Sequence, residues 1–238
     1  MSDVRIGLVA EGKTDLVVIE AALQSILGDR SFVLKLLQPE TSAPFGGAGQ
    51  HGGGWGGVYR WCRQHVSMQD PTGVNSSLQA FDLIMLHLDA DVAEETYQNA
   101  GIQNGWADLP CPFPCPPAAD SVDALRQVLC HWLDLTTETA IPPHWVFCIP
   151  SMSSEAWLVS ALYRDTAPGI LDEIECNPAL ETWLSQRPVR EIKLIRSGKK
   201  HVRSYQDVAS RLTVAWENVR NHCSQAQRFD DEVRAALA

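Results

Sequence analysis

The segment FDLIMLHLDAD, residues 81–91, is an almost unbroken apolar run that ends on two carboxylates. A strand of a parallel sheet is covered on both faces and is therefore nearly continuously hydrophobic, so this run predicts a buried strand. Side chains two residues apart on an extended chain project to the same side, which should bring Asp89 and Asp91 together. Two carboxylates that close raise each other's pKa unless a cation neutralises them. The alternative is a strand whose terminal Asp residues cap the next helix or lie in a solvated loop.

The beginning of the chain predicts a second strand that ends on an acid. Residues 4–10, VRIGLVA, predict a strand that runs directly into Glu-Gly-Lys-Thr-Asp. Apolar residues at helical spacing over residues 16–27 predict that a helix follows, with Thr14 as its N-cap. Glu11 is then at the carboxyl end of the strand. Asp15 is in the first turn of the helix, where an acid also serves simply to complement the helix dipole.

The remaining patterns predict an α/β protein. Continuous apolar runs predict strands, and apolar residues at helical spacing predict amphipathic helices. Further strands are expected at residues 31–37 and 145–150, and helices at residues 58–66, at residues 119–135 and from Ser204 onward. The Gly-rich residues 46–57 predict a flexible surface loop. They do not form a Walker loop, because no Gly-Lys-Ser/Thr follows at the required spacing.

Three predicted strands therefore lead to acids: Glu11, the Asp89 and Asp91 pair, and Glu155 shortly after the strand at residues 145–150. In a parallel sheet the carboxyl ends of the strands share one edge, so these acids should outline one pocket. Glu155 near a helix start also has the simpler explanation of the helix dipole. Clustered carboxylates need a cation, and oxygen ligands are what Mg²⁺ prefers. The sequence predicts one or two Mg²⁺ or Mn²⁺ ions at this edge.

The charge is distributed unevenly along the chain. The net charge of −10 argues against a protein that coats nucleic acid nonspecifically, because phosphate attraction dominates such binding. Seven of the 19 Lys and Arg residues, however, lie between residues 187 and 203, where such side chains can hold a phosphate backbone or a developing charge. The candidate nucleic-acid contacts are Lys13, Arg190, Lys193, Arg196, His201 and Arg203.

Composition also indicates where the protein works. No apolar run approaches the roughly 20 residues that cross a bilayer, and the N-terminus lacks the pattern of a signal peptide, so the expected location is the cytoplasm without membrane contact. Seven cysteines, an odd number scattered along the chain, do not predict a disulfide framework, and reduced thiols are expected. Cys111 and Cys115 have no second Cys or His pair nearby to complete a zinc site.

The two acidic motifs, with residues 9–15 reading VAEGKTD and residues 88–91 reading LDAD, resemble those of Toprim domains. In that family a strand leads into Glu-Gly-x-x-Asp and a helix, and a later hydrophobic strand ends on Asp-x-Asp. The resemblance implies a Toprim-like (Rossmann-like), mostly parallel sheet of about four strands flanked by helices. It places the catalytic domain at residues 1–165. Residues 166–238 would be a basic segment and a helical C-terminal extension packed on the same domain.

The Glu-Gly-x-Thr-Asp form is most similar to the overcoming-lysogenization-defect (OLD) nucleases and the small Toprim-like domains of bacterial anti-phage defence loci. That resemblance implies a Mg²⁺-dependent nuclease that hydrolyses phosphodiester bonds in DNA or RNA. Glu11 would be both general acid/base and metal ligand, and Asp15 and Asp89 would complete the first metal site. Asp91 and Glu155 would support the first or a second metal. A lysine, Lys199 or Lys200, would stabilise the charge of the transition state.

The chain departs from OLD proteins in having neither the length nor the Walker loop of an ATPase domain, so nucleotide-driven control would need a separate ATPase partner. One alternative function is an effector or interaction subunit that is inactive alone and whose basic segment docks an acidic partner. A second is a primase-type nucleotidyl transferase that uses the same acids. The sequence neither requires nor excludes a homo-oligomer.

Overall fold

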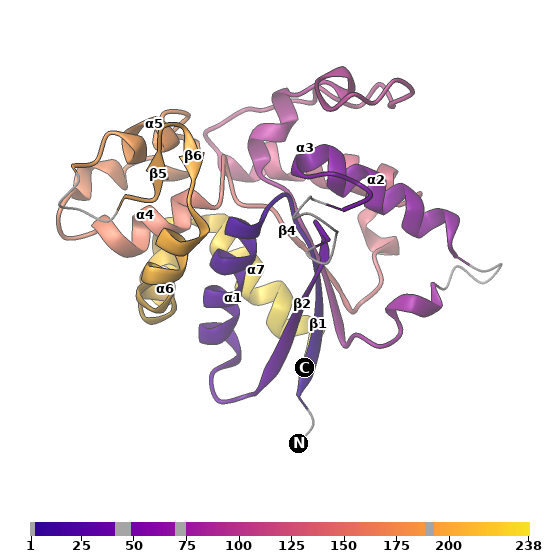
Figure 1. The fold of residues 1–238 in the computed structure, drawn as a ribbon, viewed down its shortest axis with the longest axis horizontal. Helices are drawn as coiled ribbons and strands as arrows, with labels where there is room; N and C mark the ends of the chain where they lie inside the picture. Colours follow the sequence, from indigo (N-terminus) through magenta and orange to yellow (C-terminus); the bar gives the residue numbers. More distant parts are fainter. Residues whose placement is uncertain (1–2, 41–48, 70–74, 189–192) are drawn as a thin grey trace.

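The computed structural model describes residues 3–40, 49–69, 75–188 and 193–238. At its centre is an all-parallel sheet with the strand order β2-β1-β3-β4 (Figure 1). The strands are β1 Val4–Val9, β2 Phe32–Gln38, β3 Leu83–His87 and β4 Trp145–Cys148. The predicted α/β class, with a parallel four-stranded sheet flanked by helices and followed by a helical C-terminal region, is confirmed.

Helices cover both faces of this sheet (Figure 1). They are α1 Lys13–Leu27, α2 Gly54–Ser67, α3 Ala118–Trp132, α4 Glu155–Tyr163, α5 Leu180–Ser185, α6 Val202–His222 and α7 Ser224–Ala236. Strand β3 shows the alternation that a two-sided sheet requires. Leu83 and Met85 lie in a core with α1, α4, α6 and α7, whereas Ile84 and Leu86 lie in a second core with α2 and α3. Burial on both faces explains why this strand is apolar throughout.

The register of the sheet sets which residues meet at its carboxyl edge. Val9 of β1 is opposite Leu86 of β3, and Leu86 is opposite Phe147 of β4. The chain therefore leaves these three strands at the same level. The acids that follow β1 and β3, together with the turn that follows β4, are brought to one edge, as expected for a parallel sheet.

Two predicted helix boundaries are wrong. Gly12, not Thr14, is the N-cap of α1, and its N–H donates to the Asp15 carboxylate at 2.9 Å, so the acid in the first turn also caps the helix. The last long helix begins at Val202, two residues before the expected Ser204.

The Gly-rich segment is only partly a loop, because α2 begins inside it at Gly54. Residues 46–48 lie outside the described part of the chain. In α2 the glycines allow close packing: a Cβ at Gly57 would lie 2.7 Å from the carbonyl oxygen of Gly52, and one at Gly56 would lie 2.7 Å from Cβ of Ala100. Composition alone predicts a flexible segment from these glycines. In the structure their small size instead lets a helix approach its neighbours closely.

The expectation that all thiols are reduced is also wrong, because Cys115 and Cys176 form a disulfide. It joins the loop before α3 to the short segment η7, Ile174–Cys176, and so links two parts of the chain 61 residues apart. The other cysteines are free: Cys62, Cys111, Cys130, Cys148 and Cys223. Cysteine counting could not find this pair, because only the fold brings the two residues together. Among the described residues, no helix is long and apolar enough to cross a membrane.

Helix α6 offers a direct test of the core. Leu212 is 0% exposed and packs with α1 and α4, whereas Val214, two residues later, is 87% exposed. We expect Leu212→Ala to lower the free energy of unfolding by about 2–5 kcal/mol, because it leaves a cavity. Val214→Ala should change it by less than about 0.5 kcal/mol. Urea denaturation followed by circular dichroism measures both, and equal losses in the two variants would contradict the packing described here.

Candidate metal centre

Three side chains meet at the carboxyl edge of the sheet in an arrangement that could hold a metal ion. One ligand atom from each of Asp15, His87 and Asp89 lies within 4.8 Å of those of the other two. The three residues are 3%, 0% and 7% exposed, so the group is almost completely withdrawn from water. Two carboxylates and an imidazole form a donor set that suits a divalent cation.

The two carboxylates are held in place by neighbouring helix starts. Asp89 leaves β3 in an extended conformation, and its Oδ1 accepts the backbone N–H of Ser154 at 2.9 Å. The hydroxyl of Ser154 donates to Oδ1 of Asp15 at 3.2 Å, while Oδ2 of Asp15 accepts the N–H of Gly12. Ser154, just before α4, therefore contacts both acids and fixes the distance between α1 and β3 at this edge.

His87 is part of the group although it was not among the predicted ligands. Its Nε2 lies 3.3 Å from Oδ1 of Asp89, and its Nδ1 lies 3.9 Å from Oδ2 of Asp15. Neither nitrogen makes a well-directed hydrogen bond within the described structure, which is unusual for a fully buried ring. The alternation that pairs Asp89 with Asp91 also places His87 on the same side, and this was the available sequence signal.

The charges of the group are strongly coupled. Burial raises the pKa of Asp15 to about 6, an effect that His87 opposes and Asp89 reinforces. Burial also acts to raise the pKa of Asp89, but the adjacent His87 outweighs it and keeps that pKa below its usual range. Burial alone would lower the pKa of His87, yet Asp15 and Asp89 raise it to about 9. The positive charges of His87 and Lys200 both act to lower the pKa values of the two acids.

Glu11, which the sequence predicts as a metal ligand, lies beside this group and is not one of its three members. Its Oε1 accepts the backbone N–H of Asp89 at 2.8 Å, so the residue that follows β1 is bound directly to the end of β3. Burial raises the pKa of Glu11 well above its usual value, and the negative charges of Asp89 and Asp15 raise it further, while His87 lowers it. The pKa of Glu11 therefore depends on the charges of Asp15, His87 and Asp89.

Asp91 lies at the outer side of the site. It is in the short helix η3, Ala90–Glu94, rather than in an extended strand, and the residue as a whole is exposed. Partial withdrawal of its carboxyl group from water and the charge of Asp89 raise the pKa of Asp91 to about 7. Its carboxylate is thus close enough to Asp89 to interact with it, but it is not one of the three ligand positions.

Glu155 is fully buried at the first position of α4 and already has partners. It accepts a hydrogen bond from the hydroxyl of Tyr205 at 2.6 Å and pairs with Nζ of Lys200 at 2.9 Å. Lys200 is also paired with Glu181 of α5 at 2.8 Å. Burial opposes the charge of Lys200, but Glu155 and Asp89 outweigh it and raise its pKa. Tyr205 and Glu181 were not predicted, because nothing in the sequence places them near Glu155.

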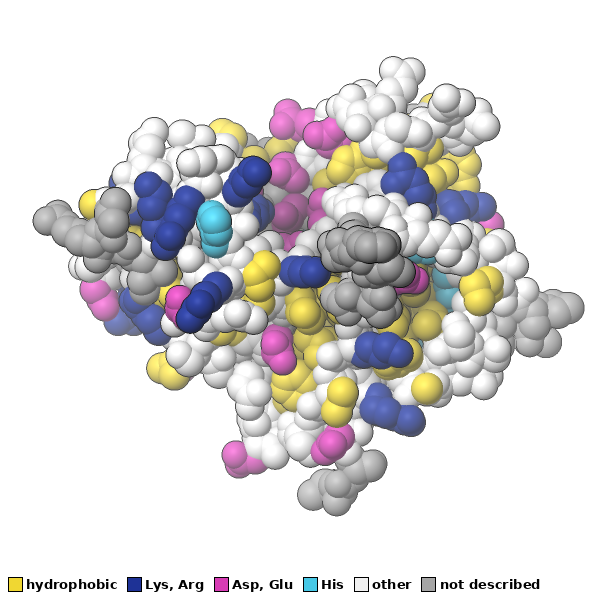
Figure 2. Space-filling model, in the orientation of Figure 1, with side chains coloured by type: hydrophobic (Ala, Val, Ile, Leu, Met, Phe, Trp, Pro, Cys, Tyr) yellow, Lys and Arg dark blue, Asp and Glu magenta, His cyan; other side chains and the backbone are white. Residues whose placement is uncertain are grey.

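Three of the predicted basic residues, Arg196, Lys199 and Lys200, are on the hairpin of β5 Ile195–Arg196 and β6 Lys199–Lys200. Figure 2 shows dark blue side chains gathered over this region beside a group of acids. Exposed positions on the hairpin, at the start of α6 and at the start of α1 are Arg196, Lys199, His201, Arg203 and Lys13. Lys193 is half-buried, and Arg190 lies outside the described residues.

Comparisons of the chain with protein-family models, with curated proteins and with solved structures found no match. The resemblance to Toprim domains therefore rests on the two acidic motifs.

The coupled acids predict a stability that depends on pH. A carboxyl group whose pKa is raised by folding destabilises the protein as the pH rises through the interval between its unfolded and folded values. For Asp15 this interval runs from 3.8 to about 6. In EDTA at pH 8, Asp15→Asn should therefore be more stable than the unmodified protein by about 1–3 kcal/mol, and the difference should shrink at pH 5.

Thermal and urea unfolding at both pH values measure this effect, with the exposed Asp29→Asn on the loop after α1 as the matched control. Added Mn²⁺ should stabilise the unmodified protein and leave Asp15→Asn unchanged. A variant that is less stable than the parent at pH 8 in EDTA would show that Asp15 is not destabilised by its neighbours.

Proposed function

We propose that the protein is a metal-dependent nuclease that hydrolyses phosphodiester bonds in DNA or RNA. The observation that carries the proposal is the buried Asp15, His87 and Asp89 group with Glu11 bound to its edge. A cluster of acids next to a lysine and a basic hairpin suits a phosphodiester substrate, which needs both cations and positively charged side chains. A role in bacterial anti-phage defence is part of the proposal, on the strength of the motifs alone.

The residues present fit a divalent cation, since both ring nitrogens of the buried His87 lack a directed partner within the described structure and two carboxylates lie beside them. The carboxylates suit Mg²⁺ or Mn²⁺, and the imidazole favours Mn²⁺ over Mg²⁺. When bound there, the ion would polarise a phosphate oxygen and lower the pKa of a water molecule. A second ion would have to use Asp91, because Glu155 is already paired with Lys200.

Glu11 is placed to act on a proton. Its Oε1 is fixed by the N–H of Asp89, whereas Oε2 has no hydrogen-bond partner in the described part of the chain. A carboxyl group anchored through one oxygen can accept a proton from an attacking water, or give one to a leaving oxygen, at the other. This geometry supports a role for Glu11 as general acid/base, in addition to its contact with the group formed by Asp15, His87 and Asp89.

Lys200 is the better placed of the two candidate lysines. Its side chain is 27% exposed and is held by Glu155 and Glu181, whereas Lys199 is exposed and forms no ion pair with a described residue. An ammonium group held near Asp89 can stabilise the negative charge that develops on a phosphate. Tyr205, Glu155 and Glu181 would be positioning residues for it. Arg196, His201 and Arg203 would bind the nucleic-acid backbone.

One observation favours a version of this function that a partner controls. The ammonium group of Lys200 is paired with two carboxylates, which together neutralise it and compete with a phosphate. A partner protein, such as a separate ATPase, could activate the enzyme by drawing Glu181 of the short helix α5 away from Lys200. In this version the chain alone would be nearly inactive on nucleic acid.

Removing the acids tests the proposed chemistry. Glu11→Ala and Asp89→Asn should each lower cleavage of plasmid, single-stranded DNA or transfer RNA at least about 100-fold, because each removes a group that contacts the reacting centre. Cleavage should require Mg²⁺ or Mn²⁺ and stop in EDTA. Asp82→Asn is the matched control, since Asp82 precedes the same strand β3 at its opposite end and is exposed.

Cleavage that persists in Glu11→Ala or Asp89→Asn, with contaminating nucleases excluded, would refute the proposal. If the unmodified chain does not cleave any of the three substrates, Glu181→Gln separates two explanations. Activity that appears in Glu181→Gln supports control through Lys200, whereas continued inactivity argues against a nuclease.

A second pair of variants distinguishes the two lysines. Lys200→Ala should reduce cleavage about 100-fold, and Lys200→Arg should restore part of it, because the charge is retained. Lys199→Ala should weaken substrate binding only a few-fold, and more at low salt than at high salt, as expected for an exposed contact to phosphate. Rates measured at two salt concentrations, with circular dichroism to confirm folding, provide the comparison. Equal effects of the two Ala substitutions on cleavage would contradict the role proposed for Lys200.

A further inference from the structure

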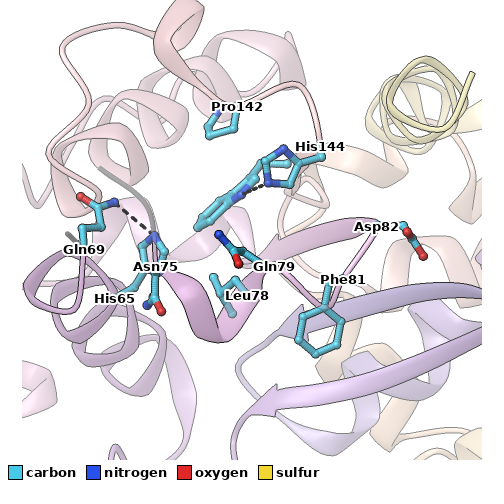
Figure 3. A pocket seen from close by; sticks show the side chains of 10 residues that line it. His65, Gln69, Asn75, Leu78, Gln79, Phe81, Asp82, Pro142 and His144 are labelled. Carbon is cyan, nitrogen blue, oxygen red and sulfur yellow. Dashed lines mark hydrogen bonds between the residues drawn. The ribbon is translucent and has the colours of Figure 1, made fainter. Parts of the chain in front are cut away.

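A cavity of about 620 Å³ lies at the opposite end of the sheet from the metal centre (Figure 3). Phe81 and Asp82 precede β3, and His144 precedes β4, so the cavity is at the amino ends of the two strands. Strand β3 alone is roughly 16 Å long, which separates the cavity from the acids at its other end. Its volume is within the range of small-molecule binding sites, roughly 300–1,000 Å³.

The inner wall of the cavity is aromatic. The rings of His65 and Trp145 have centroids 5.0 Å apart, and Trp61 stacks on His65 with an interplanar angle of 3°. Phe81 lines another side. This wall is fixed by the sheet and by α2, because Trp145 begins β4 and both Trp61 and His65 belong to α2. The ring planes of His65 and Trp145 are tilted by 52°, and Trp61 supports His65 without lining the cavity. Aromatic rings bind planar ligands by stacking.

Three carboxamides, those of Gln69, Asn75 and Gln79, line the cavity together with the imidazole of His65. The carboxamide nitrogens of Asn75 and Gln69 lie 3.1 Å from Nδ1 and 3.3 Å from Nε2 of His65. Burial lowers the pKa of His65 to about 4, so the ring is neutral at pH 7. Gln79 lies in the middle of the cavity in Figure 3, and its amide has no hydrogen-bond partner among the described residues.

The cavity also lacks what a phosphate needs. None of the described residues that line it is Lys or Arg. Its single acid, Asp82, lies apart from the other side chains in Figure 3 and accepts the backbone N–H of Arg5 at 2.7 Å. A phosphate group would meet no Lys or Arg among the described lining residues and would face the carboxylate of Asp82, whereas an uncharged ligand does not need a charged partner.

We infer that this cavity binds the base of an uncharged nucleoside, stacked on the aromatic wall and hydrogen-bonded to the carboxamide of Gln79. A carboxamide offers one donor and one acceptor side by side, the pair that matches N7 and the N6 amino group of adenine. Adenosine is therefore the expected preference. The inference does not depend on the proposed nuclease activity, because it uses none of the residues of the metal centre.

Isothermal titration calorimetry on the full chain in EDTA tests this inference with adenosine, guanosine, cytidine and uridine. Adenosine 5′-monophosphate and a five-nucleotide single-stranded DNA distinguish a free nucleoside from a base that belongs to a phosphate-bearing strand. We expect adenosine to bind most tightly, the two phosphate-bearing probes to bind at least about tenfold more weakly, and Glu11→Ala to bind like the parent.

Two substitutions at Gln79 locate the site. Gln79→Ala removes the hydrogen-bonding group and should weaken adenosine binding about fivefold or more. Gln79→Trp fills the cavity and should abolish binding. Because Gln79 is exposed, both variants should fold. Gln24→Ala, at an exposed position of α1, is the matched control and should bind adenosine like the parent.

Each outcome decides the question. Adenosine binding that is weakened in Gln79→Ala and lost in Gln79→Trp, but kept in Gln24→Ala, supports the inference. It is overturned if none of the four nucleosides binds at millimolar concentration, if both Gln79 variants bind like the parent, or if the monophosphate or the oligonucleotide binds more tightly than adenosine. Nucleoside binding and nucleic-acid cleavage are measured separately, so the failure of one leaves the other intact.

Discussion

The constraint on which the rest of this structure depends is the burial of two carboxylates next to each other at the end of a parallel sheet. Removing charge from water is costly, and two like charges in a small volume add repulsion to that cost. This cost is offset by the imidazole of His87, which lies between Asp15 and Asp89. It is offset further by the backbone N–H groups of Gly12 and Ser154, which donate to the carboxylate oxygens. These contacts hold the carboxylate of Asp15 from α1 and that of Asp89 after β3 close to the ring of His87, where a divalent cation could bind.

The order of the sheet makes this arrangement possible. Strands β1 and β3 are neighbours in the centre, so the start of α1 and the end of β3 meet although 74 residues separate Asp15 from Asp89 in the sequence. Helices on both faces exclude water from the group, the turn after β4 supplies Ser154, and the first residue of α4 is Glu155. The candidate metal centre thus depends on how several elements are placed next to one another rather than on any one of them.

The basic hairpin is held next to this centre by the ion pairs of Lys200. Its two strands have two residues each, and a hairpin of that size has little stability of its own. Lys200 of the hairpin forms ion pairs with Glu155 and with Glu181. The hydroxyl of Tyr205 donates a further hydrogen bond to Glu155. The position of the exposed basic residues relative to the acids therefore depends on ion pairs, which respond to salt and to a competing anion more readily than the packed sheet does.

Local sequence determined the strands, most of the helices and the acids at the ends of β1 and β3, because hydrophobic periodicity depends only on neighbouring residues and on burial. It placed Glu11, Asp15 and Asp89 at one edge because parallel strands end together. Only the tertiary structure decided that His87 joins them, that Cys115 pairs with Cys176, and that Lys200 rather than Lys199 contacts Glu155. It alone also revealed the cavity around Gln79. These features depend on contacts between residues far apart in the chain, and a distance in space is not encoded in the spacing of one segment.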